Sequence, residues 1–183
     1  MFSNTFWVHI QHSVLTEINL GKLDFALSEN FEGMFFGLYH LEKLDVSYFN
    51  TQYSKSFENM FYGCAELKEI NVSNFKTTNC ENITNMFYHC QSLKSIDMLN
   101  WDMKDINNIE FLFFMCCSLK SIKMNFNNNN SKIFEEYGIL GTYDKELNIF
   151  KGLPKEGSFI WKKGLDCNKL LKLLPESWNR KQE

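Results

Sequence analysis

The stretch from Met60 to Asn85 reads MFYGCAELKEINVSNFKTTNCENITN, and its main features recur along the chain at a fixed interval. The Met-Phe pair that opens it returns every 26 residues, at 34–35, at 86–87 and, as Leu-Phe, at 112–113. Cys64 recurs as Cys90 and Cys116. Because a unit this short cannot bury its apolar side alone, successive copies must stack as a solenoid.

Each 26-residue copy is called a rung, and extending the frame in both directions predicts five of them. The predicted rungs form one repeat region over 1–137 and cover residues 8–33, 34–59, 60–85, 86–111 and 112–137. The first is degenerate and the last is degraded. Residues 138–183 leave the period, and we predict that they form a C-terminal cap. This cap would contain a hairpin of residues 147–150 and 158–161, and a short helix over 165–174 that ends before Pro175.

Apolar and polar residues alternate at the end of the segment 67–72, which is typical of a half-buried strand. Ile70 and Val72 would face the core, and the same segment of every rung would pair in register as a parallel sheet. Parallel neighbours need a crossover, and roughly 20 residues of each rung remain for it. We expect a short helical turn over 82–90 on this return side. The predicted fold class is therefore an α/β solenoid with a parallel sheet on one face.

Composition narrows the class of protein. The chain has 183 residues, of which 44% are hydrophobic and 22% charged, with a formal net charge of −3. These values are ordinary for a folded globular chain and argue against a general polyanion binder. No apolar run approaches the length of a membrane span, and no basic leader precedes Lys22. We therefore expect no membrane contact and a cytoplasmic location, in a host cell or the bacterial cytosol.

The unit Met-Phe-x-x-Cys-x-x-Leu-x-x-Ile-Asp/Asn-Val-Ser-Asn-Phe, best seen from Met60, resembles the BspA-like, mycoplasma-type leucine-rich surface repeat. The resemblance covers about residues 30–126. It implies a leucine-rich-repeat-like solenoid that serves adhesion or protein binding. It implies no catalytic residues.

Candidate chemistry is sparse. Cys64, Cys90 and Cys116 share a position with Leu38, so we interpret them as core residues. The four histidines form no hydrolase or zinc motif, and the glycines form no phosphate-binding loop. We predict no catalytic residue, no metal site and no cofactor, and hence that the chain is not an enzyme.

The strand face supplies the one positive indication of a site. Side chains that alternate with the core positions would point outward as a regular grid, flanked by a row of lysines. The aromatic residues that we expect to reach the surface are Tyr48, Tyr53, Tyr62 and Tyr88. The grid could equally serve only to solvate the sheet. The predicted partner-binding residues are Lys43, Asp45, Glu69, Asn71, Ser95, Asp97, Lys123, Lys68, Lys94 and Lys120.

These features predict a non-catalytic protein–protein interaction module. One concrete version is a small intracellular inhibitor, from a phage or mobile element, of a host defence enzyme such as a nuclease. The alternatives are a surface adhesin fragment and an enzyme with an unrecognised site. The predicted partner is another protein, such as a nucleic-acid-processing enzyme, and direct nucleic-acid contact is the weakest option. A homodimer through the N-terminal edge stays open.

Overall fold

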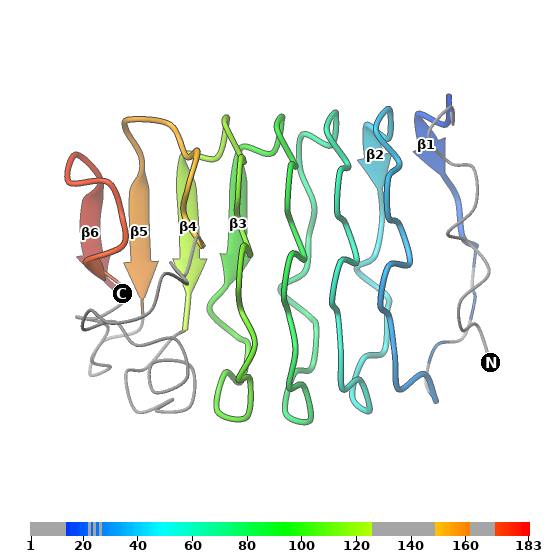
Figure 1. Ribbon diagram of the computed structural model, residues 1–183. Coiled ribbons are helices and arrows are strands. Elements are labelled where there is room, and N and C mark those ends of the chain that lie inside the picture. Colours follow the sequence, from blue (N-terminus) through cyan, green and yellow to red (C-terminus); the bar gives the residue numbers. More distant parts are fainter. Residues whose placement is uncertain (1–13, 22, 24, 26, 126–148, 162–170) are drawn as a thin grey trace.

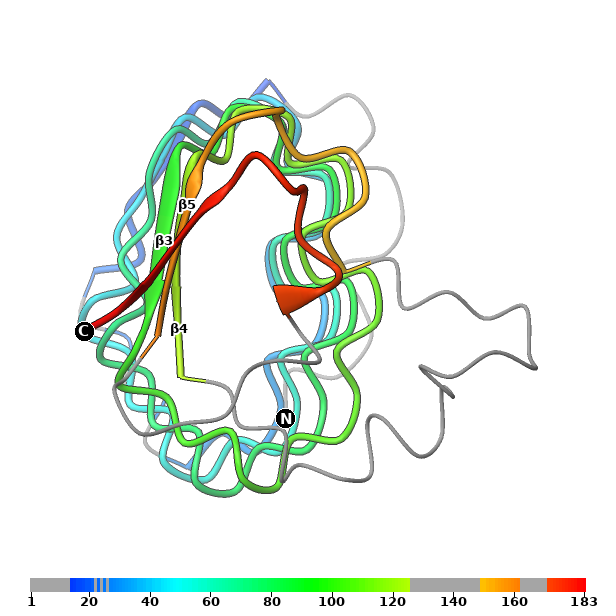
Figure 2. The same cartoon turned by 90° about the vertical axis from the view of Figure 1, so that its left-hand side faces the viewer.

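The chain winds into a solenoid with strands along one side and turns along the other (Figure 1). The computed structural model describes residues 14–21, 23, 25, 27–125, 149–161 and 171–183. Seen along the winding axis, β3, β4 and β5 lie on one side of the coil and the return segments on the opposite side (Figure 2). The core lies between the two.

Six short strands form the sheet side, all of them paired in parallel. They are β1 (Glu17–Ile18), β2 (Lys43–Leu44), β3 (Ser95–Met98), β4 (Ser121–Met124), β5 (Ser158–Trp161) and β6 (Asn179–Gln182). Glu17 pairs with Lys43, and Ser95 pairs with Ser121, so the 26-residue register is confirmed. Apolar residues such as Ile96 and Met98 point inward from β3, while Ser95 and Asp97 are exposed.

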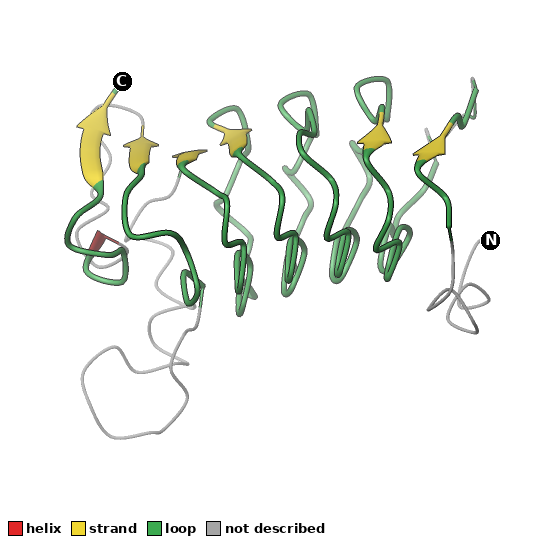
Figure 3. Ribbon diagram, turned by 90° about the horizontal axis from the view of Figure 1, so that it is seen from above, coloured by secondary structure: helices red, strands yellow, loops and turns green. Residues whose placement is uncertain are grey.

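The strand side is interrupted at the third rung. The pairings give a two-stranded sheet of β1 and β2 and a four-stranded sheet of β3 to β6. Among the described residues, no backbone hydrogen bond joins residues 69–72 to the rung on either side. Figure 3 draws the third rung as a loop between β2 and β3, and it has no place in either ladder.

The return side contains turns, so the predicted helical turn over 82–90 is wrong. Backbone N–H groups alternate between two kinds of acceptor. Those of Asn59, Phe61 and Gly63 donate to the next rung, while those of Met60, Tyr62 and Cys64 donate to carbonyls three residues back. Within the described residues almost no helix occurs, so the parallel-sheet part of the predicted α/β class is confirmed and its helical part is not.

Positive φ angles explain why the return side bends in this way. Asn59 and Gly63 have φ of 56° and 73°, and each is the third residue of a turn closed by an i to i−3 bond. A positive φ at that position is the feature of type II turns, which favour Gly and Asn. In the next two rungs the residues equivalent to Gly63 are His89 and Met115, and their φ angles are 58° and 59°.

Aromatic ladders run through the core along the winding axis. Phe35, Phe61, Phe87, Phe113 and Phe150 stack with centroid distances of 5.5, 5.5, 5.7 and 6.2 Å. A second, half-buried ladder lies outside the return turns, where Tyr62 and Tyr88 stack at 4.5 Å. A strict repeat produces such ladders because it places side chains of the same kind above one another in successive rungs.

The C-terminal part extends the same sheet, so the predicted hairpin is wrong. β5 pairs with β4 and β6, in parallel on both sides. Ile149 accepts a hydrogen bond from the N–H of Phe113 and thereby continues the return side. The predicted boundary at 137/138 and most of the predicted helix, residues 165–170, lie outside the described residues.

The sheet ends on polar side chains. Arg180 in β6 is paired with the buried Phe159, and its guanidinium donates to the carbonyls of Leu171, Pro175, Glu176 and Trp178. All four residues of β6 are exposed. A charged side chain at an inward strand position discourages further strand addition at that edge.

Candidate functional site

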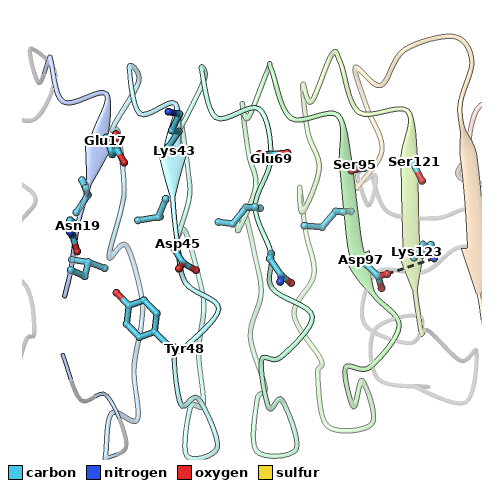
Figure 4. A pocket seen from close by; sticks show the side chains of 16 residues that line it. Glu17, Asn19, Lys43, Asp45, Tyr48, Glu69, Ser95, Asp97, Ser121 and Lys123 are labelled. Atoms are coloured by element: carbon cyan, nitrogen blue, oxygen red, sulfur yellow. Dashed lines mark ion pairs between the residues drawn. The ribbon is translucent and has the colours of Figure 1, made fainter. Parts of the chain in front are cut away.

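A groove of about 840 Å³ runs across the outer side of the first five rungs. Seven of the ten predicted partner-binding residues line it: Lys43, Asp45, Glu69, Asn71, Ser95, Asp97 and Lys123. Figure 4 shows that they come from neighbouring rungs. The repeat register therefore brings these seven side chains together, as the sequence predicts, although this does not test their role.

The row of Asn and Asp residues in the groove has a structural task. The Oδ1 atoms of Asn19, Asp45, Asn71 and Asp97 each accept a hydrogen bond from the backbone N–H two residues later, at 2.9 to 3.1 Å. These are Asx turns, and they end the strand segment in four successive rungs. The hydrogen bonds from Ser47 also lower the pKa of Asp45, so this carboxylate stays charged to a lower pH than an ordinary aspartate.

The neighbouring row is different because its side chains have no such task. The side chains of Glu17, Lys43, Glu69, Ser95 and Ser121 make no hydrogen bond or ion pair with any described residue. Glu17, Lys43, Glu69 and Ser95 are exposed. We call these five residues the open row. They present polar groups that a partner could engage without breaking the fold.

The three remaining predicted residues, Lys68, Lys94 and Lys120, lie beside the groove and do not line it. Lys68 is 2.7 Å from Glu42, which raises the pKa of the lysine and lowers that of the glutamate. Lys94 and Lys120 are exposed and make no ion pair with a described residue. Lys123 lies between Asp97 and Glu183, at 3.7 and 3.4 Å. The lysine row is therefore partly neutralised.

Tyr48 also lines the groove and is absent from the ten predicted residues. Its side chain lies beside Asp45 and Asn19 in Figure 4, and it is 41% exposed. Burial of part of the ring and the Asp45 charge both raise the pKa of Tyr48. In the sequence it stands three residues after Asp45, just beyond the strand, where the other rungs have Lys22, Asn74, Asn100 and Phe126.

The cysteine prediction is confirmed for the repeat position. Cys64, Cys90 and Cys116 are fully buried, and each Sγ donates to a carbonyl of the preceding rung at 3.0 to 3.2 Å. Burial raises the pKa of Cys64 to about 12. In the described part of the chain, no group of three or more His, Cys, Asp or Glu residues is arranged to hold a metal ion.

Comparison with known proteins identifies a family. The model of the family described as "Mycoplasma protein of unknown function, DUF285" matches residues 2–136. No curated protein matches the chain, and no solved structure does. Within the residues that the structure describes, no helix has the length and apolar character of a membrane span. The match covers the repeat region and is compatible with a mycoplasma-type repeat, whereas the finer BspA-like assignment stays a prediction. The chain belongs to this Mycoplasma protein family of unknown function.

Proposed function

We propose that the chain is a non-catalytic protein-binding module that holds its partner in the strand-face groove. The observation that supports this most is the open row, because its side chains in the groove have no structural partner among the described residues. Four of the five side chains stand on strands, and paired strands lie about 4.8 Å apart, so little order has to be gained on binding. Solenoids commonly bind partners on such extended faces.

The identity of the bound partner would distinguish an intracellular role from a role at the cell surface. An intracellular inhibitor of a defence enzyme and an adhesin of the BspA-like type would both use a rigid side-chain grid. A captured nucleic-acid-processing enzyme would favour the inhibitor, and a captured host surface protein would favour the adhesin. The pull-down below therefore tests the function and selects between these two settings.

The test is a pull-down with the full chain from native lysate, with protein and nucleic acid both measured. The test variant carries Ser95→Arg with Ser121→Arg, which adds two long side chains to the open row without removing a hydrogen bond. The matched control carries Gln52→Arg with Thr78→Arg, two exposed positions outside the groove that add the same charge. Both variants are first shown to unfold at the wild-type denaturant midpoint.

We expect one stoichiometric protein that the wild type and the control capture and the test variant does not. Capture that is equal for the test variant and the control would contradict the proposal, since the groove would then not be the binding face. Capture of nucleic acid alone, with a steep salt dependence, would also contradict it.

A further inference from the structure

The groove carries one carboxylate per rung over its first four rungs. These are Glu17, Asp45, Glu69 and Asp97, and they alternate between the open row and the Asx row. Among the described residues, Asp97 is the one of these four that is paired with a lysine, Lys123. The described residues that line the half of the groove nearer the N-terminus thus include three carboxylates and one lysine, Lys43, a balance that attracts a cation.

Tyr48 gives an independent indication of a cationic ligand in the same half. Its ring is exposed in the groove and lies beside the Asp45 carboxylate, as Figure 4 shows. The Asx turn engages the Oδ1 atom of Asp45, and the Ser47 side chain also contacts this carboxylate, which stays exposed in the groove. An aromatic face next to a carboxylate is the combination that binds ammonium and guanidinium groups, through cation–π and charge-assisted contacts together.

We propose that this half of the groove recognises an arginine or lysine side chain on an extended segment of the partner protein. The cationic group would lie between Asp45 and Tyr48, with Glu17 and Glu69 on either side. The inference rests on the proposed protein-binding function and states the chemistry of the partner. A phosphate backbone would meet the same carboxylates and be repelled, so the observations favour a basic peptide over a nucleic acid.

The test is an NMR titration of the isotope-labelled full chain with a synthetic Gly-Arg-Gly-Arg-Gly-Arg peptide, and with a Gly-Glu counterpart, at physiological salt. Two variants probe the subsite. Asp45→Asn keeps an Oδ1 acceptor for the Asx turn, and Tyr48→Leu keeps apolar bulk. The matched controls are Asp102→Asn, where the carboxylate forms the same kind of turn, and Tyr53→Leu, whose ring is 48% exposed. None of the control side chains lines the groove.

We expect the arginine peptide to shift amides at 43–49 and 69–71, and the glutamate peptide to leave them unchanged. Each subsite variant should weaken binding by about two- to fivefold, the size of an exposed cation–π or ion-pair contact, and the controls should not. No binding, or binding that all four variants weaken equally, would overturn the inference. A partner captured through the groove but insensitive to Asp45→Asn and Tyr48→Leu would overturn it while leaving the proposed function intact.

Discussion

The two sides of the third rung differ in how they are held to their neighbours. On the return side, the N–H groups of Phe61, Gly63, Ile83 and Asn85 all donate to the fourth rung, at 2.7 to 3.0 Å. On the strand side, residues 69–72 donate no backbone hydrogen bond to either neighbour. The same rung is thus bonded on its return side and open on its strand side. At this rung the return side maintains the stack, and the strand side is free to engage the proposed partner.

Packing reinforces this difference. The buried phenylalanine ladder lies along the return side, and the buried thiols donate to carbonyls of that side. On the strand side of the third rung, Ile70 is only partly buried and lines the groove.

Truncating the buried ladder should have the largest effect. Phe87 is fully buried between Phe61 and Phe113, so Phe87→Ala should lower the free energy of unfolding by about 3–5 kcal/mol. Ile70→Ala, on the open side, should cost less than half as much. Urea unfolding followed by circular dichroism measures both. Equal losses for the two variants would remove the distinction between the sides.

Alkaline pH should weaken the return side through its thiols. Burial raises the pKa of Cys64 and Cys80 to about 12, and raises the pKa values of Cys90 and Cys116 as well. The unfolded chain therefore loses these protons first, and stability that is complete below about pH 8.5 falls as the pH rises toward the folded-state values. Within that window, each thiol should lower the free energy of unfolding by about 1.4 kcal/mol for every unit that the pH rises.

The denaturant midpoint measured from pH 7 to 10.5 checks this prediction. Cys90→Ala should be less stable at pH 7 but lose stability less steeply with pH than the wild type. If the denaturant midpoint fell equally steeply with pH in both proteins, burial in the stack would not be what keeps the Cys90 thiol protonated. The exposed Cys117 supplies the contrast, because it should react with a thiol reagent in the folded protein while the four buried thiols do not.

Glycine substitutions should show a smaller difference between the sides. Gly63 on the return side has a φ of 73°, and an added Cβ would lie 3.2 Å from Cε1 of Tyr39. Gly21 on the strand side has a φ of 60° and open space around it. Replacement by Ala should cost about 1–2 kcal/mol for the left-handed backbone alone at either site. We expect Gly63→Ala to cost more, because Tyr39 must also move, and a larger loss for Gly21→Ala in thermal unfolding would contradict this.

The period predicted a large part of this structure. Outside the strand segment of the third rung, where Ile70 is only partly buried and no ladder forms, the repeated core positions are buried and the strand segments pair at the expected offset, because a solenoid maps sequence period directly onto spatial register. Seven of the ten site residues line one groove for the same reason. Tyr48 was not among them, because one residue that departs from the repeat leaves no column to detect.

The rest could not be read from the period, for identifiable reasons. Asn59 and Gly63 indicate positive φ angles, but a helical turn fits the same apolar spacing. The side chains of Asn71 and Asp97 form Asx turns, but in the sequence they cannot be told apart from ordinary exposed polar residues. β5 and β6 join the sheet at offsets other than 26, since Ser121 pairs with Ser158 and Ser158 with Asn179. Pairing there depends on the edge that β4 exposes, which no repeat pattern records.

Amide hydrogen exchange within the third rung distinguishes which of its two sides holds the stack together. The amides of Phe61, Gly63, Ile83 and Asn85 donate to the next rung, whereas those of residues 69–72 donate to no neighbouring rung. In the folded full chain, the first group should exchange slowly and the second group rapidly, although both belong to one rung. Equal protection of the two groups, or stronger protection of residues 69–72, would contradict the account, because the strand side would then hold the stack together.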